Sequence, residues 1–431
     1  MTPAEVLSLI HEYAAEHVDL RYTDLRGRLR HVTVPAARLE PAGAGFAPLP
    51  HADAALAADA ATAFADPFCQ HPTVALLAER VTAGGEPLEL EPRAVARRAA
   101  AALAAGGRGM TVEVGLELAF FVFEQAYFDQ SVAAGRYGVD SREGVWRRGR
   151  DEADNLGLAL DPARADEALP PSDTLHNLRA EMVAALTACG VAWEEHRRGP
   201  ATGGQAVMRL APRPLVAAAD AVQVLKYVVR NVAARHGKVA TFMPQPLGDG
   251  PGSGVRATLR LTQAGRSVSV ETAAAAAAGL KRHAAGLAAL ARPTTNSYRR
   301  GSVSGDDAAR GAGETEVVAS AGADGPVVRY DGLDGGANPY LALAGVAAAL
   351  CDGLTEGGAA AGHVAAAAER AGRPGDLAAA RAALARDTEF LTRSGVFAAA
   401  LLAAWDEVLG ADLAAMGRRP HPYEFCLYFD L

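Results

Sequence analysis

The sequence is poor in cysteine, has no surplus of basic charge and has no long uncharged hydrophobic run. Its four cysteines, Cys69, Cys189, Cys351 and Cys426, lie far apart in 431 residues and form no CxxC pair. This spacing argues against a disulfide framework and against a cysteine-based zinc site. We therefore expect a protein that works in the reducing cytoplasm.

Charge and hydropathy exclude two further kinds of partner. The chain has 50 acidic and 42 basic residues and a formal net charge of −8, which does not favour binding to nucleic acid. The first 20 residues include Glu5, His11, Glu12 and Asp19, where a signal peptide would need an apolar run. No other stretch is an uncharged apolar segment long enough to span a bilayer. We expect neither a nucleic-acid partner nor a membrane partner.

The first quarter of the chain has the pattern of a small separate domain. A helix is predicted near residues 3–16, because apolar residues recur there on one helical face. Two alternating segments within residues 18–34 flank a short turn and predict a β-hairpin. A later helix ends after Ala105 at a Gly-Gly pair. We place a domain boundary there, which gives predicted domains of residues 1–105 and 106–431.

The remaining residues alternate predicted strands with predicted helices. The strongest strand pattern spans residues 112–123, and shorter ones span 239–243 and 255–261. Helices are predicted at 174–189 and 218–235, each ended by a nearby glycine. Helices interleaved with alternating strands indicate an α+β fold whose antiparallel or mixed sheet is covered on one face.

Several familiar catalytic motifs are absent. The chain has no GxxxxGK[ST] loop, no GxGxxG that opens a helix, no HExxH and no GxSxG. These absences argue against a P-loop, a Rossmann nucleotide site, a metallopeptidase and a serine hydrolase. The basic triplet His196-Arg197-Arg198 is interpreted as part of a solvated loop, and His283 and His363 as surface or helix-end histidines.

Other segments carry a more specific pattern. They include Arg179-Ala180-Glu181-Met182, Pro293-Thr294-Thr295-Asn296-Ser297-Tyr298 and Ala337-Asn338-Pro339-Tyr340. Further ones span residues 18–24, 31–35, 66–68, 226–233, 240–244, 252–254 and 421–425. In this order, and through nearly the whole chain, they resemble glutamine synthetase of the bacterial type I class.

The resemblance carries expectations about fold and assembly. It implies a small N-terminal β-grasp-like domain, followed by a larger glutamine synthetase-type catalytic domain with a curved antiparallel sheet that forms the active-site funnel. It also implies a homo-oligomeric ring, a hexamer or a dodecamer, in which neighbouring subunits share each active site.

The resemblance also identifies positions where the chain departs from the family. In that family ATP activates the γ-carboxylate of glutamate, ammonia displaces phosphate, and divalent metals held mainly by carboxylates stabilise the reacting groups. Of the six positions that match the main metal ligands, only Glu117 keeps one. The other five are Ala119, Gly199, Val207, Arg256 and Arg329. A lone carboxylate holds hydrated Mg²⁺ poorly. We therefore expect no metal and no cofactor, and would expect ATP and Mg²⁺ only if this matching of positions is wrong.

Positions that match catalytic and regulatory residues of the family also carry different residues in this chain. Residues 46–50 match the family loop whose aspartate helps to deprotonate ammonium, and Ala47 stands in the position of that aspartate. No catalytic residue can therefore be assigned. The chain has no tyrosine between Tyr340 and Tyr423, so the tyrosine that is adenylylated in the family has no counterpart.

The candidate pocket combines retained and replaced positions. It consists of Glu117, Arg256, Arg329 and Asp306, with Gly252 and Arg300 as candidates for binding an amino acid. In one interpretation the arginines pair with Glu117 and replace the metal as internal cross-links. The protein would then be a pseudoenzyme that acts through assembly or regulation, alone or joined to an authentic glutamine synthetase.

In a second interpretation the guanidinium groups bind a carboxylate or a phosphate directly. The protein would then be a metal-independent enzyme of specialised metabolism that acts on an amino acid or an amine beside a biosynthetic partner. Ordinary ligation of glutamate and ammonia is the third alternative, and the replaced ligands disfavour it. The sequence leaves the first two interpretations open.

Overall fold

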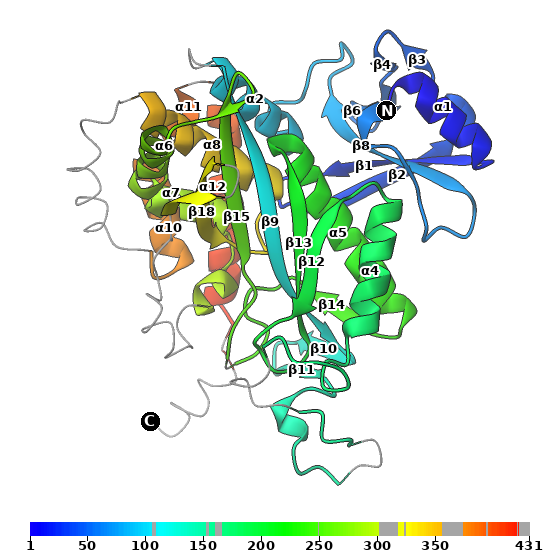
Figure 1. Ribbon diagram of the computed structural model, residues 1–431, viewed down its shortest axis with the longest axis vertical. Coiled ribbons are helices and arrows are strands. Elements are labelled where there is room, and N and C mark those ends of the chain that lie inside the picture. The colour runs from blue at the N-terminus through cyan, green and yellow to red at the C-terminus, as the bar shows by residue number, and fades with distance from the viewer. Residues whose placement is uncertain are drawn as a thin grey trace.

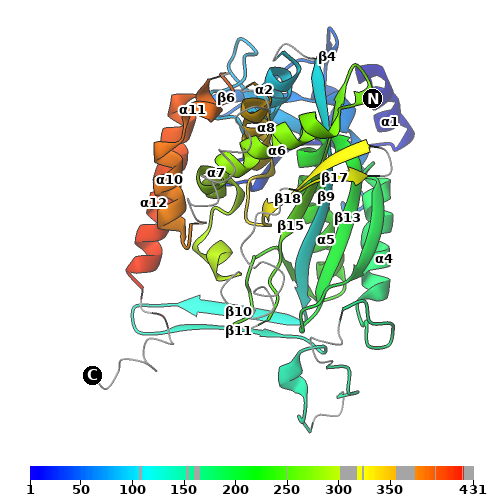
Figure 2. The ribbon, with the colours of Figure 1, turned by 60° about the vertical axis from the view of Figure 1, so that its left-hand side comes forward.

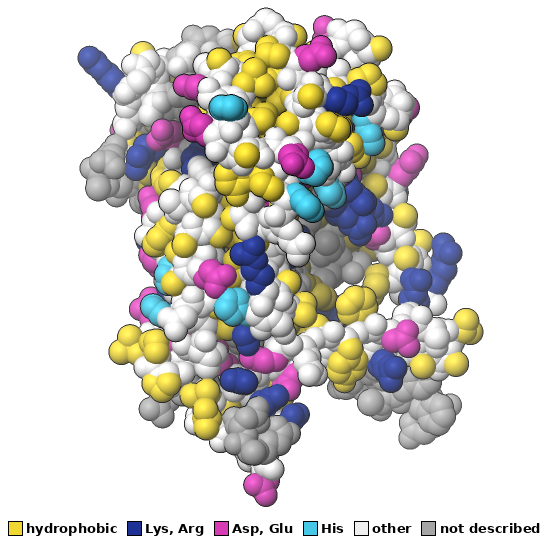
Figure 3. Space-filling view, turned by 90° about the vertical axis from the view of Figure 1, so that its right-hand side faces the viewer, with side chains coloured by type: hydrophobic (Ala, Val, Ile, Leu, Met, Phe, Trp, Pro, Cys, Tyr) yellow, Lys and Arg dark blue, Asp and Glu magenta, His cyan; other side chains and the backbone are white. Residues whose placement is uncertain are grey.

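The computed structural model describes residues 1–105, 109–151, 155–159, 166–248, 250–300, 318–322, 325–355, 374–393, 395–419 and 421. Within these ranges the chain forms a small N-terminal sheet and a larger sheet with helices packed beside it (Figure 1). None of the helices described there is long and apolar enough to cross a membrane. On the face shown in Figure 3, hydrophobic and charged side chains are interspersed, and histidines gather with basic side chains near the middle.

The first helix, α1 (Pro3–Glu12), is shorter than the sequence predicts. It begins with a capping box: the Thr2 hydroxyl accepts from the Glu5 backbone N–H at 3.3 Å, and the Glu5 carboxylate accepts from the Thr2 N–H at 2.7 Å. The predicted end near Glu16 is wrong, because the chain turns at Ala14, where φ is 49°, and a strand follows. The apolar pattern of the helix extends beyond Glu12, where α1 ends, so the pattern alone does not locate the helix end.

The N-terminal sheet contains the predicted hairpin. β1 (His17–Thr23) pairs antiparallel with β2 (Leu29–Pro35), which confirms that prediction, and parallel with β8 (Thr73–Val81). The strand order is β2-β1-β8-β6-β5, with β7 also paired to β8. The shorter elements are η1 (Ala36–Arg38), β3 (Pro41–Ala42), β4 (Gly45–Phe46), β5 (Leu49–His51), β6 (Ala54–Ala58), η2 (Ala60–Thr62) and β7 (Phe64–Ala65). Apolar side chains of α1, β1, β6 and β8 form a separate small core.

The large sheet has the strand order β12-β13-β9-β15-β18-β17, and all neighbouring strands in it are antiparallel. Its strands are β9 (Met110–Phe123), β12 (Trp193–Arg198), β13 (Gln205–Pro214), β15 (Val255–Gln263), β17 (Val318–Gly322) and β18 (Gly325–Leu333). β14 (Val239–Thr241) pairs with β9, and β16 (Arg266–Ser267) pairs with β15. The long strand predicted from alternation is β9, at the centre of this sheet. A separate exposed hairpin of β10 (Gln125–Gln130) and β11 (Gly135–Asp140) follows β9 in the chain and projects beyond the large sheet (Figure 2).

Helices cover one face and one end of the large sheet. α4 (His176–Ala188) and α5 (Leu215–Arg235) lie against β12, β13 and β9, and α6 (Val270–Arg282) and α7 (Ala284–Ala291) lie beside β18 (Figures 1 and 2). The others are α2 (Pro92–Ala105), η3 (Val145–Arg147), η4 (Thr295–Arg299), α8 (Pro339–Thr355), α10 (Leu377–Arg386), α11 (Glu389–Thr392) and α12 (Ala399–Gly417). Their apolar faces share one core with the sheet. The α+β class with one covered sheet face is confirmed, whereas the domain boundary after Ala105 stays a prediction, since α2 packs into this same core.

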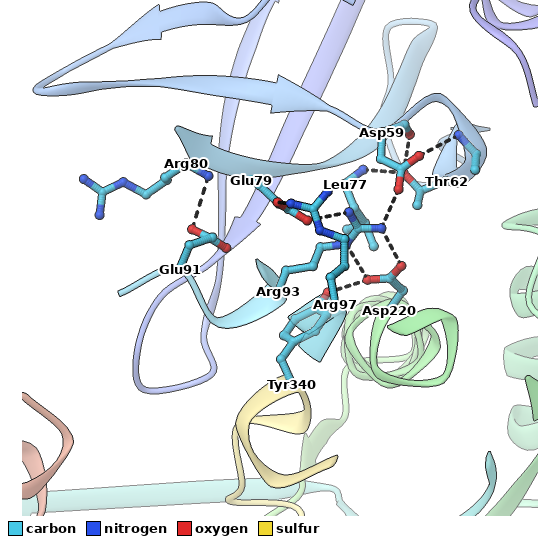
Figure 4. Close-up of polar contacts among 11 residues, drawn as sticks. Asp59, Thr62, Leu77, Glu79, Arg80, Glu91, Arg93, Arg97, Asp220 and Tyr340 are labelled. Carbon is cyan, nitrogen blue, oxygen red and sulfur yellow. Dashed lines mark hydrogen bonds and ion pairs between the residues drawn. The ribbon is translucent and has the colours of Figure 1, made fainter. Parts of the chain in front are cut away.

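A buried polar network joins the N-terminal sheet to helices α2, α5 and α8 (Figure 4). Arg93 of α2 donates to Asp220 of α5 at 2.9 Å, to Glu79 of β8 at 3.1 Å and to Asp59 at 2.6 Å. The Tyr340 hydroxyl of α8 donates to the same Asp220 at 2.7 Å. Carboxylates from the N-terminal sheet and from the helical layer therefore converge on one guanidinium.

Candidate functional site

The uncovered face of the large sheet carries the candidate pocket. Side chains alternate along β9, so Leu116 and Leu118 point into the core toward α5 and Glu117 points to the opposite face. In the sheet register, Glu117 pairs with Arg209 of β13 on one side and with Arg256 of β15 on the other. The neighbouring strands thus place two arginines beside this carboxylate.

Three guanidinium groups surround the Glu117 carboxylate. Arg197 of β12 donates a hydrogen bond from Nη2 to Oε1 of Glu117 at 3.2 Å. The Nη1 atoms of Arg256 and Arg209 lie 3.8 and 3.9 Å from the carboxylate oxygens. The Glu117 side chain is 16% exposed and that of Arg256 is 48% exposed. The carboxylate is therefore neutralised by side chains from three other strands.

The pairing continues across the sheet as a row of alternating charges. Arg256 donates from Nε to Asp331 of β18 at 2.9 Å, and Arg209 binds Glu195 of β12. We call Glu195, Arg209, Glu117, Arg256 and Asp331, together with Arg197, the charge row. These residues come from five strands that are adjacent in the sheet, β12, β13, β9, β15 and β18. The charge row pairs its own charges and leaves partly exposed guanidinium groups facing solvent.

Sequence reasoning identified two members of the charge row and missed four. Arg209 lies two residues after Val207, and Asp331 lies two residues after Arg329. Side chains two apart on a strand share a face, so two of the four missed residues, Arg209 and Asp331, are beside positions that the resemblance had singled out. This spacing is the signal that could have found them.

The basic triplet His196-Arg197-Arg198 lies in strand β12, so its interpretation as a solvated loop is wrong. The Arg198 side chain is 1% exposed and pairs with buried Glu143 at 3.1 Å. Arg197 reaches Glu117. The two carboxylates are 55 and 80 residues away from their arginines in the chain, which is why the triplet looks solvated in the sequence.

Arg329 does not contact Glu117. It lies on β18 opposite Thr258 of β15 and shares a face with Asp331. Among the residues that the structure describes, the Arg329 side chain forms no ion pair, and Asp331 supplies the carboxylate that Arg256 contacts. The expected contact between Glu117 and Arg256 is found, but the arginines that complete the cluster come from β12 and β13.

Three further positions that match metal ligands of the resembling family have no side-chain oxygen. Ala119 and Val207 are paired directly between β9 and β13, so an apolar pair lies next to Glu117. At Gly199 a Cβ would lie 2.6 Å from Oε1 of the buried Gln205 side chain. A larger side chain at position 199 would therefore have to displace Gln205.

Gly252 and Arg300, the candidates for binding an amino acid, do lie together. A Cβ at Gly252 would be 2.7 Å from Cγ of Arg300, and a Cβ at Gly254 would overlap the Arg300 guanidinium. Burial raises the pKa of the neighbouring Asp334 carboxyl, although the charge of Arg300 acts in the opposite direction. Asp334 Oδ2 has no hydrogen-bond partner in the part of the chain that is described. Asp306 lies outside the described residues.

Comparison with known proteins assigns the chain to a family. The model of the glutamine synthetase catalytic domain matches residues 89–428. The chain is 32% identical to glutamine synthetase of Microchaete diplosiphon, with 100% of this chain and 99% of that protein covered. It is also 32% identical to glutamine synthetase of Salmonella typhimurium, with both chains covered completely. The chain belongs to the glutamine synthetase family.

Solved structures agree with this assignment at the level of the fold. The cryo-EM structure of Plasmodium falciparum glutamine synthetase superimposes with a TM-score of 0.82 at 16% identity, over 99% of both chains. A structure of GmaS without ligand gives a TM-score of 0.73 at 24% identity, over 98% of this chain and 99% of the other. The predicted fold of the glutamine synthetase type, with its curved antiparallel sheet, is thereby confirmed. Members of this family are typically oligomeric rings.

A divalent-cation site of the glutamine synthetase kind needs several oxygen ligands around each ion. Within the described ranges, no three His, Cys, Asp or Glu side chains are grouped in a way that could hold a metal ion. On the sheet face, the Glu117 carboxylate is bound by arginines, and residues 119 and 207 are apolar. The described residues at these positions therefore do not fit the metal ions that the family chemistry requires.

Proposed function

We propose that this chain is a glutamine synthetase-family pseudoenzyme, which does not ligate glutamate and ammonia and acts in the cytoplasm through assembly or regulation. One observation carries the proposal: Glu117 accepts from Arg197 and lies within 4 Å of Arg209 and Arg256. A carboxylate surrounded by guanidinium groups is already neutralised. A metal ion would have to displace these cations and overcome their repulsion.

The replaced positions support the same proposal. Arg256 and Arg329 bring positive charge to places where the family has metal ligands, and Ala119, Gly199 and Val207 bring no donor atom. Phosphoryl transfer in this family depends on cations that neutralise phosphate oxygens, while the protein mainly supplies position. Ala47, in the place of the catalytic aspartate, likewise offers no group that could accept a proton.

Assembly is the property that survives loss of the metal site. The family resemblance covers the whole chain, and family members are typically rings. The proposed form is a homo-oligomeric ring, a hexamer or a dodecamer, alone or mixed with subunits of an authentic glutamine synthetase.

The experiment combines a mass measurement with a ligase assay. Native mass spectrometry of the purified protein should find a closed ring, and assays with glutamate, ammonia, ATP and Mg²⁺ or Mn²⁺ should detect no glutamine. Salmonella typhimurium glutamine synthetase serves as the active control. Glutamine formation that requires the metal, at a rate lost in Glu117→Gln, would refute the proposal.

A second candidate is a metal-independent enzyme that binds an amino acid or an amine through its arginines. The specific observation is Arg329, whose guanidinium has no ion pair within the described residues and lies on the same sheet face as Arg256. Stabilisation of the protein by L-glutamate without metal, lost in Arg329→Gln and kept in Arg266→Gln, would favour this candidate. Arg266 is a suitable control because it is an exposed arginine of the short strand β16.

A further inference from the structure

A cavity of about 490 Å³ lies on the other side of the large sheet from Glu117. It opens between the β1–β2 hairpin of the N-terminal sheet and helix α5. Its lining includes Arg28 and His31 from the hairpin, Lys226 and Arg230 from α5, and residues 335–337 from the loop before α8. Lys226 also lines a second, smaller pocket together with Leu116 and Leu118, which lie on the core face of β9. The cavity is therefore separate from the charge row and independent of the function proposed above.

The cavity holds a surplus of positive charge. Arg21, Arg26 and Arg30 also line it, but each is paired with an aspartate. Arg28, Lys226 and Arg230 differ, since no carboxylate of the described chain lies within 4.0 Å of their charged groups. Asp19 is the acidic residue in the lining, and it already binds Arg21, His31 and Thr33. Within the described residues, three cations therefore face this space without an ion pair, although the more distant Asp334 carboxyl favours the charged form of Lys226.

Lys226 is the most informative of the three cations. It is buried, at 7% exposure, and its Nζ donates to the Gly335 carbonyl at 2.8 Å. An ammonium group has three N–H donors, so two are left for a ligand. Burial lowers the pKa of Lys226 to about 8; the nearby Arg230 charge acts in the same direction, and the Asp334 carboxyl acts in the opposite one. A buried cation without a carboxylate is costly, and a bound anion would offset that cost.

Arg230 lies one helical turn further along α5. Its guanidinium is 5.5 Å from the centroid of the Phe242 ring, and the residue is exposed toward the cavity. A planar guanidinium binds carboxylate or phosphate oxygens through two parallel hydrogen bonds. Arg230 and Lys226 are four residues apart on α5, so the planar guanidinium and the ammonium lie on the same face of the helix.

We infer that this cavity binds a small, multiply charged anion, either a dicarboxylate or a phosphorylated metabolite. Lys226 and Arg230 are its main contacts on α5, and Arg28 approaches from the hairpin. The volume is within the range of small-molecule sites. Because the ligand would touch both the N-terminal hairpin and α5, its binding stabilises the packing of the N-terminal sheet on the large sheet.

The test measures binding to the full-length protein by calorimetry and thermal shift. The probes are glutarate, inorganic phosphate and glucose 6-phosphate, each compared with sodium chloride at the same ionic strength. The variants are Arg230→Gln and Lys226→Met. The matched control is Arg235→Gln, an exposed arginine on the same helix that binds the Pro67 carbonyl and stacks on Phe68 outside the cavity lining.

We expect at least one probe to stabilise the wild type and Arg235→Gln equally, and to bind Arg230→Gln about tenfold or more weakly. Binding of glutarate would indicate a dicarboxylate ligand, and binding of phosphate or glucose 6-phosphate would indicate a phosphorylated one. If no probe raises the melting temperature above the sodium chloride control, the inference is wrong. It is also wrong if Arg235→Gln loses as much affinity as Arg230→Gln, because binding would then follow overall charge. Arg230→Gln changes an exposed side chain, so the test stands even if Lys226→Met does not fold.

Discussion

The chain contains two arginine–carboxylate networks that use the same chemistry in different surroundings. In the network around Arg93, the side chains of Arg93 and Glu79 are 6% and 4% exposed. In the charge row, Arg209 and Arg256 are 42% and 48% exposed. Water screens the second set of charges and hardly reaches the first. Similar ion pairs therefore join the N-terminal sheet to the helical layer in one place and form an accessible charged surface in the other.

The difference predicts unequal consequences of losing one partner. When a buried charge loses its partner, its desolvation free energy is no longer offset and the folded state is destabilised. A part-exposed charge can instead be solvated by water.

Arg93→Ala should lower the free energy of unfolding by about 3–5 kcal/mol. The substitution leaves Asp59, Glu79 and Asp220 without their shared cation. Urea unfolding of the purified protein measures the change. Arg97→Ala on the same helix is the control, since Arg97 is half-exposed and binds only Glu79 in the described chain. Equal effects of the two substitutions would contradict the proposed contrast.

Glu91→Gln should stabilise the protein above pH 7 by at most about 4 kcal/mol. Burial raises the pKa of Glu91 to about 7, and one carboxylate oxygen has no partner in the described chain. The folded carboxyl stays protonated while the unfolded one ionises, so wild-type stability falls as pH rises from about 4.3 to 7. The difference between Gln variant and wild type should grow over this interval in unfolding titrations and then stay constant. A pH-independent difference would refute the assignment.

His283 provides a second buried network, and its interpretation as a surface histidine is wrong. It lies at the junction of α6 and α7, as expected for a helix-end residue, but is only 7% exposed. Its ring nitrogens contact Asp387 at 2.7 Å and Asp352 at 2.9 Å, and the ring stacks on Phe390. Two carboxylate acceptors require both ring nitrogens to donate, so the imidazole is held as a cation. His363 lies outside the described residues.

His283→Gln should cost about 2 kcal/mol at pH 6, and less at higher pH. Burial lowers the pKa of His283, but the hydrogen bonds to the two aspartates outweigh it and the pKa is raised overall. The stabilisation is therefore complete below the unfolded pKa of about 6.5 and is lost as pH rises through the folded pKa. Arg282 and Arg393 also pair with Asp352 at this site. Unfolding of both proteins across this pH range measures the difference, and a constant difference would contradict the assignment.

Glu117→Gln should change stability least, by about 1 kcal/mol or less. The arginines around it are part-exposed and become hydrated when the carboxylate charge is removed. The effect should also shrink as salt is added, because salt screens exposed pairs. A loss as large as that of Arg93→Ala, independent of salt, would show that the charge row is as deeply desolvated as the Arg93 network.

Sequence reasoning recovered most of the fold. Alternation located β9, β15 and the N-terminal hairpin, because a strand with one buried face must alternate. The first helix was predicted too long, since an apolar pattern does not reveal where the chain has to turn at Ala14. Residues 41–65, which are weakly patterned, form several short strands that are held by pairing with β8 and with one another.

The candidate site was recovered only in part. The resemblance placed Glu117 and Arg256 at positions that face each other across two strands, and the sheet register agrees. It did not predict Arg197 and Arg209, because their role depends on which strands become neighbours. Residues 226–233 contribute to the family resemblance, but the sequence does not indicate that Lys226 is buried or that Lys226 and Arg230 line a cavity.

The α+β class, the resemblance to the glutamine synthetase family and the side chains at each expected ligand position can all be derived from the chain without its structure. Those properties follow from residue identity and local periodicity, which do not depend on distant contacts. The tertiary structure is needed to know which arginines surround Glu117, which carboxylates share Arg93, and which cations face a cavity with no ion pair among the described residues. Strand register and helix packing bring together residues far apart in the chain, and burial then sets how strongly each charge interacts.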